Sequence, residues 1–153
     1  MYNPRIKGGS QEYGTVKVLS HGAIAKNDFV TLKTDGQAEP TAAGEGIFGI
    51  ALESAAGASE VITVARVYPG MRVLMDNDNV GTTFAASHVG GRFDTTGATG
   101  AQLVDTSTVA QDGTDPGQLL CIEYNPKGFG LDKDTSIGLY EISEVQGSTN
   151  ATA

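Results

Sequence analysis

The sequence predicts an all-β protein, a small antiparallel β-barrel or sandwich of short strands that carries an extended N-terminal arm. Residues 46–78 support this class because they read as three consecutive strands separated by turns at Ala55-Ala56-Gly57 and Pro69-Gly70. The composition supports it too, since the 153 residues include 21 glycines, 5 prolines and no tryptophan, which favours strands and turns over helices. Residues 81–89 are the longest helix candidate and support one helical turn at most, because they lack a sustained apolar stripe.

The middle strand of the 46–78 block is apolar on both faces. One face carries Val61, Thr63, Ala65 and Val67, and the other carries Ile62, Val64, Arg66 and Tyr68. We therefore expect this strand to be covered on both sides.

Further strands are expected before and after this block. Residues 15–19 and 29–33 alternate apolar and polar side chains and predict half-buried strands. Asp35-Gly36 predicts a hairpin turn into a short strand at 37–39. Shorter strands are expected at 91–95, 101–104 and 118–124, and a last one over 137–140.

The length fits one domain. We divide the chain into an extended arm at 1–13, a single β-domain at 14–146 and a polar tail at 147–153. The net charge is −8, yet residues 1–26 hold Arg5, Lys7, Lys17 and Lys26 against Glu12 alone, which is +3 and leaves −11 for the remainder. This acidic body would repel nucleic acid, whereas the basic arm can steer docking onto an acidic partner.

Cys121 is the only cysteine, so a disulfide within the chain is excluded, and its place in the apolar run 119–122 predicts a buried thiol. No segment approaches the roughly 20 apolar residues that a membrane span needs, and the first residues do not read as a signal peptide. We therefore expect a soluble protein made in the cytoplasm, with no membrane partner.

The sequence predicts no catalytic residue, metal site or cofactor, and hence a protein that is not an enzyme. Residues 76–81 begin like a calcium loop, but Val80 and Ser87 stand where oxygen ligands are required, so a turn capped by its own Asp and Asn side chains is favoured over a cation site. His21 and His88 lie far apart and are expected in loops or on the surface. The chain contains no G-x-S-x-G elbow, and Gly97-Ala98-Thr99-Gly100 lacks the lysine and helix of a phosphate loop.

Three segments carry a resemblance to a known family: residues 23–32 (AIAKNDFVTL), 46–51 (GIFGIA) and 57–64 (GASEVITV). Together they resemble the small capsid decoration, or cement, proteins of tailed bacteriophages. The similarity covers about residues 14–76 and extends loosely through 117–124. It implies a β-barrel or β-tulip subunit that binds the outer capsid surface, contacts the major capsid protein, bridges neighbouring capsid subunits and often forms a trimer. The expected location is then the exterior of the virion.

The resemblance supplies no contact residues. The extended, positively charged arm is the segment we expect to dock on the capsid, and its candidate contact residues are Tyr2, Arg5, Ile6, Lys7 and Tyr13. The alternative hypothesis is a carbohydrate-binding β-module or a head-fibre base. Such a module uses clustered exposed aromatics, whereas this chain has no tryptophan and five scattered tyrosines.

Overall fold

The computed structural model describes residues 14–108, 117–126 and 136–147. Their regular structure is antiparallel β-sheet with two single 3-10 turns, η1 (Ala86–His88) and η2 (Thr106–Thr108). The prediction of an all-β, sandwich-like protein is therefore confirmed. The helical turn expected within 81–89 is η1.

The first sheet, which we call the N-sheet, has five strands in the order β1-β5-β4-β2-β3. Its members are β1 (Thr15–Leu19), β2 (Phe29–Leu32), β3 (Ala38–Pro40), β4 (Gly49–Ala51) and β5 (Val61–Arg66). The sheet curls, because Ser20 at the end of β1 forms an isolated parallel bridge with Ala38 of β3. Its concave face encloses a small core of Ile24, Val30, Ala38, Ala51, Ala55, Ile62 and Val64.

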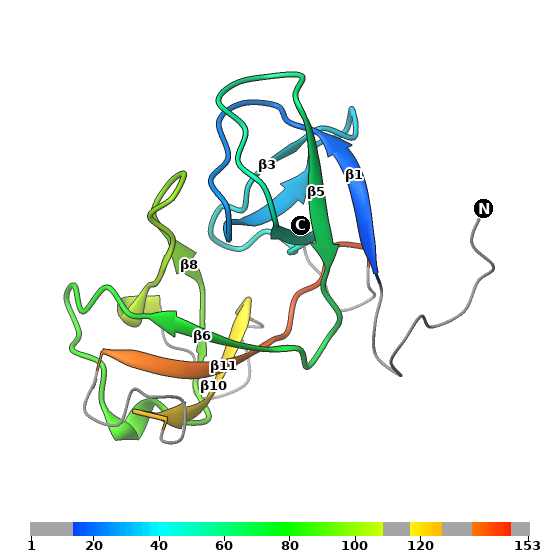
Figure 1. Ribbon diagram of the computed structural model, residues 1–153. Helices are drawn as coiled ribbons and strands as arrows, with labels where there is room; N and C mark the ends of the chain where they lie inside the picture. The colour runs from blue at the N-terminus through cyan, green and yellow to red at the C-terminus, as the bar shows by residue number, and fades with distance from the viewer. Residues whose placement is uncertain (1–13, 109–116, 127–135, 148–153) are drawn as a thin grey trace.

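The second sheet, the C-sheet, has four strands in the order β6-β11-β10-β7. They are β6 (Arg72–Asp76), β7 (Arg92–Phe93), β10 (Leu119–Tyr124) and β11 (Ile137–Ile142), and a separate hairpin pairs β8 (Thr95–Thr96) with β9 (Leu103–Val104). Figure 1 shows the N-sheet in one lobe, and the C-sheet with this hairpin in the other.

A larger core joins the two lobes. It contains Phe29 and Ile47 from the N-terminal half together with Phe93, Leu119, Cys121, Tyr140 and Ile142 from the C-sheet. Ile47 also forms a parallel bridge with Val145. The N-sheet thus has one face on its own core, while Phe29 and Ile50 on the other face pack against the shared core.

The expected three-strand block is confirmed as β4, β5 and β6, but its last strand leaves the N-sheet and pairs with β11. The expectation that the middle strand is covered on both sides is wrong. Val61 of β5 is 63% exposed, and Thr63 and Ala65 on the same face are half-buried. The physical reason is that the C-sheet covers this face only near Phe29 and Ile50, so the β5 end that carries Val61 projects beyond the cover.

The strand expected over 91–95 is split into β7 and β8 around Asp94, and β7 and β8 belong to different sheets. The strands expected at 15–19 and 118–124 are present as β1 and β10, and those at 29–33 and 37–39 as β2 and β3 with ends shifted by one residue. Residues 101–104 contribute β9, and the strand expected at 137–140 continues to Ile142.

Cys121 is fully buried in the shared core, as predicted. Burial raises the pKa of its thiol from 9.0 to about 11. We expect very slow labelling by a thiol reagent in native buffer, even at pH 9, because the thiol is buried and very little of the reactive thiolate forms. Denaturant should make labelling fast. Fast labelling of the native protein at pH 8 would contradict this burial.

The raised pKa of the Cys121 thiol also makes the stability of the folded protein depend on pH. A thiol that ionises near pH 9 when unfolded and near 11 when folded stabilises the protein below pH 9. That contribution is lost as the pH rises from 9 to 11, because only the unfolded state ionises there.

Candidate functional site

The side-chain amide of Gln118 joins the two lobes. Gln118 directly precedes β10 and is completely buried. Its Oε1 accepts hydrogen bonds from the Thr95 main-chain N–H (2.7 Å) and hydroxyl (3.1 Å). Its Nε2 donates to the carbonyls of Ala42 (2.9 Å) and Glu45 (2.7 Å) in the loop between β3 and β4. One amide thus satisfies main-chain groups of both lobes.

Two more glutamines bond the main chain of β2 in the same way. Gln102 accepts from the Phe29 N–H (2.7 Å) and donates to the Phe29 carbonyl (3.0 Å). Gln146 accepts from the Leu32 N–H (2.8 Å) and donates to the Leu32 carbonyl (2.8 Å). Each amide therefore replaces a neighbouring strand for one residue of β2.

A buried carboxylate ties the β8–β9 hairpin to the N-sheet. Asp28 is 3% exposed and accepts hydrogen bonds from the main-chain N–H groups of Gly100 (3.0 Å) and Ala25 (3.0 Å). The Thr99 hydroxyl donates to the carbonyl of Ala23 (3.1 Å). The hairpin is thereby held against the turn that precedes β2.

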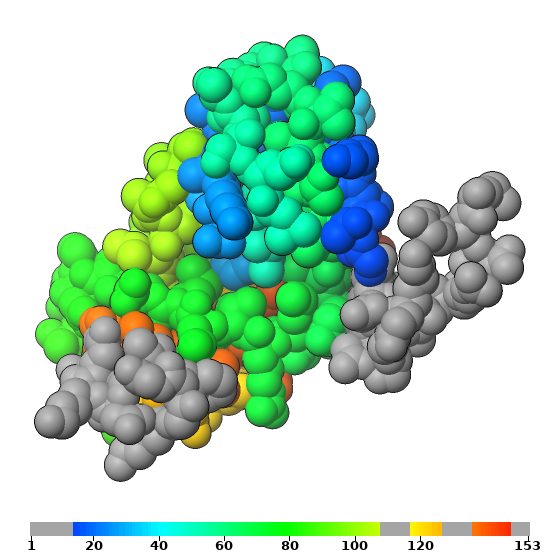
Figure 2. Space-filling view, in the orientation of Figure 1, coloured from blue at the N-terminus to red at the C-terminus, as the bar shows by residue number. Residues whose placement is uncertain are grey.

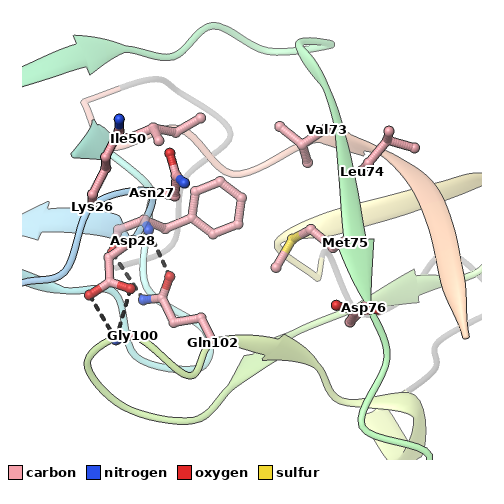
Figure 3. Close-up of a pocket in the computed structure, with 11 residues that line it drawn as sticks. Lys26, Asn27, Asp28, Ile50, Val73, Leu74, Met75, Asp76, Gly100 and Gln102 are labelled. Carbon is pink, nitrogen blue, oxygen red and sulfur yellow. Dashed lines mark hydrogen bonds between the residues drawn. The ribbon is translucent and has the colours of Figure 1, made fainter. Parts of the chain in front are cut away.

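The hydrogen-bonded residues Asp28, Gly100 and Gln102 line a cleft of about 550 Å³ between the lobes. Its walls are Lys26–Phe29 and Ile50 from the N-sheet side, Gly100 and Gln102 from the hairpin, and Val73–Asp76 from β6. Figure 2 shows the N-sheet, the hairpin and β6 meeting on one face of the molecule. In Figure 3, Val73 and Met75 point from β6 into the cleft, whereas Leu74 points away.

The cleft offers apolar contacts from Phe29, Ile50, Val73 and Met75, and charges at Lys26 and Asp76. No group of three His, Cys, Asp or Glu side chains that could hold a metal ion occurs among the described residues.

The residues at 76–81 form a capped turn, as predicted. Asp78 Oδ1 accepts from the N–H of Val80 (3.1 Å) and from the N–H (3.2 Å) and hydroxyl (3.0 Å) of Thr106. Asn79 Oδ1 accepts from the N–H of Phe84 (2.8 Å). Of the two oxygen ligands that the calcium-loop pattern suggests, Asp78 thus bonds main-chain N–H groups and the Thr106 hydroxyl. The other, Asp76, accepts a hydrogen bond from the Ser136 hydroxyl (3.4 Å).

The expectation for the two histidines is half right. His21 is exposed in a loop. His88 is buried, which corrects the prediction of a loop or surface position. Its ring stacks on Phe84, with 5.7 Å between ring centroids, and its Nδ1 accepts from the Ala85 N–H (3.1 Å). The turn η1 folds the ring back onto the shared core, which pairwise spacing in the sequence does not reveal.

A second surface feature lies on the exposed part of the N-sheet. Leu19 and Val61 are directly paired across β1 and β5 and are 42% and 63% exposed. Beside them the Lys17 ammonium donates to the Thr63 hydroxyl (2.6 Å). These residues form a small apolar patch with one basic neighbour.

The candidate contact residues Tyr2, Arg5, Ile6, Lys7 and Tyr13 lie outside the described residues, as does the tail beyond Gly147. Among the described tyrosines, Tyr140 is buried, Tyr124 packs on the shared core and Tyr68 is half-buried. The aromatic cluster of the carbohydrate-binding hypothesis is therefore not found in the described part of the chain.

No known family model matches this chain, and a search of curated proteins finds no similar sequence. Within the described ranges, no helix is long and apolar enough to cross a membrane.

The Gln118 amide should be essential for stability. Gln118→Met keeps the approximate shape but leaves the Thr95 N–H and the Ala42 and Glu45 carbonyls without this partner. At 1–3 kcal/mol for each unsatisfied buried group, we expect a loss of about 3 kcal/mol or more in the free energy of unfolding, measured by urea denaturation. Gln37→Met is the control, because the side-chain oxygen of Gln37 bonds the exposed His21 ring, and should change stability by less than about 0.5 kcal/mol. Equal effects of the two substitutions would contradict the role of Gln118.

Proposed function

We propose that this protein is a structural virion component that binds the outer surface of a tailed-phage capsid and stabilises it by bridging neighbouring capsid subunits. The observation that supports this proposal best is the arrangement of the three segments that resemble decoration proteins. Residues 23–32 end in β2, 46–51 contain β4 and 57–64 contain most of β5. These strands are direct neighbours in the N-sheet. The three segments that carry the resemblance therefore lie together in one sheet.

The construction of the body also fits a bridging role. A bridge transmits force between subunits only if its own parts hold a fixed arrangement. Here the shared core and the glutamine amides tie the two lobes together over long sequence separations. The expected partner is the major capsid protein, and self-association as a trimer is favoured, as the resemblance implies.

The proposal predicts stabilisation of assembled shells without turnover. A ligand that binds the assembled shell but not free capsid subunits stabilises it by about 2.7 kcal/mol per site at a hundredfold excess over Kd. Purified protein should therefore co-sediment with expanded capsids that lack it and raise their melting temperature. Unexpanded capsids are the control, because the bridging site requires the final subunit spacing. Failure to bind expanded capsids, or binding without a change in melting temperature, would overturn the proposal.

A second prediction concerns the arm. Removing residues 1–13 should weaken capsid binding, since the segment carries Arg5 and Lys7 on an otherwise acidic protein. The measurement is co-sedimentation at several salt concentrations, with circular dichroism to verify that the β-body is folded. The double variant Arg5→Gln/Lys7→Gln separates charge from length. Unchanged binding by a folded, truncated protein would rule out the arm as a capsid contact.

A further inference from the structure

The face of β1 and β5 that points away from the small core, which we call the open face, exposes apolar side chains that adjoin one another. Leu19 and Val61 are directly paired on it and are 42% and 63% exposed. Leu52, which follows β4, is 39% exposed, and its N–H donates to the Thr63 carbonyl (2.9 Å). Ala51 before it points into the small core, so Leu52 points to the open face. Adjoining exposed apolar side chains, unlike single ones, are typical of contact surfaces.

A cation and an anion lie on opposite sides of β5 at this face. The Lys17 ammonium extends from β1, which lies beside β5 in Figure 1, and donates to the Thr63 hydroxyl (2.6 Å). The Thr63 N–H donates to the Glu53 carboxylate (2.7 Å). The N–H and C=O groups of one strand residue point to the same side, and the Thr63 carbonyl bonds Leu52 after β4. Glu53 therefore lies on the β4 side of β5, and Lys17 lies on the β1 side.

These two charges make the open face complementary to itself. A two-fold axis that runs parallel to β5 turns the β1 side of one copy over the β4 side of another. Lys17 of each copy then faces Glu53 of the other, and the charge contact is made twice. A two-fold axis across the strands would instead place Lys17 on Lys17, where like charges repel. Charge complementarity thus favours a second copy in one orientation.

Pairing through the edge of β1 suits a second copy less well. β1 is the edge strand of the N-sheet, and exposed Lys17 is its central residue. Two copies of β1 paired antiparallel about their centres would place the two lysines directly opposite each other, which is destabilising. Lysine on an edge strand is a usual protection against such strand addition. A second copy is therefore expected on the face of β1 and β5 rather than on the edge.

We propose that the open face is covered by the open face of a second copy of this chain, related to the first by a two-fold axis parallel to β5. Val61 meets Val61 at the axis, and Leu52 packs on the aliphatic stem of Lys17 of the second copy. This inference does not rest on the proposed function, because it concerns two copies of the isolated protein. It is also separate from the trimer that the resemblance implies, because a two-fold contact joins only two copies.

The size of the patch and the charge of the chain limit the strength of this contact. A few apolar side chains bury less surface than the interface of a stable dimer requires. Each copy carries a net charge of −8, so two copies repel each other at long range. Both effects predict a weak dimer that forms at high protein concentration.

Sedimentation equilibrium of the full chain between about 10 μM and 1 mM tests the proposal. The dimer should populate toward the upper end of this range. Val61→Asp should raise its dissociation constant about tenfold or more, because it buries a carboxylate at the two-fold axis. Val80→Asp is the matched control, since Val80 is 67% exposed in the other lobe and gains the same charge. It should leave the association unchanged, and circular dichroism verifies that both variants are folded.

Exchanging the two charges tests the orientation. Lys17→Glu alone and Glu53→Lys alone should each weaken the dimer about tenfold or more, because each places like charges opposite each other at two positions. The double variant should restore the dissociation constant to within about threefold of the original. A general effect of net charge would move the two single variants in opposite directions, so it is distinguished from the specific pairing.

A protein that stays monomeric up to about 1 mM would overturn the proposal. An oligomer that Val61→Asp leaves intact would overturn it too, because another surface would then hold the copies together. Failure of the double variant to restore the dimer would contradict the two-fold arrangement and with it the proposal. No capsid is present in these measurements, so a failure to bind capsids leaves their result unaffected.

Discussion

The arrangement of the two lobes depends on glutamine amides that bond main-chain groups. Gln118 is the central case, since one fully buried side chain accepts from β8 and donates to two carbonyls of the β3–β4 loop. A buried carbonyl or N–H without a partner costs about 1–3 kcal/mol, so the lobes cannot shift without losing several such bonds at once. Apolar packing alone has no comparable directional requirement. The amides therefore select one relative position, and the shared core around Phe29 and Tyr140 stabilises it.

The cleft follows from this arrangement. The lobes meet closely at Ile47 and Val145 and diverge toward the β8–β9 hairpin. Asp28 holds the hairpin across the opening, so the cleft keeps a third wall. A tight turn is needed for this position. Gly97 has φ +92°, and a Cβ there would collide with the Ala101 carbonyl, which explains why glycine occupies the bend.

Local features of the fold could be predicted from the sequence, and tertiary features could not. Alternating residues identified β1 and β2, and the 119–122 run correctly predicted the burial of Cys121. The transfer of β6 to the second sheet was missed because strand periodicity carries no information on which partner a strand joins. Gln118 was read as the first residue of a strand, since one polar side chain gives no sign of the four groups that it will meet. The candidate contacts in the arm lie outside the described residues, so their role is still a prediction.

An open strand edge is either a liability or a binding surface, and what surrounds it decides which. At β6 the N-sheet and the hairpin stand opposite the edge, so a second four-stranded sheet cannot approach it without meeting Lys26–Phe29. The walls of the cleft therefore limit what can approach this side of β6. Protection of β6 thus comes from its walls rather than from lysine or proline on the strand, which allows its central position to be the apolar Leu74.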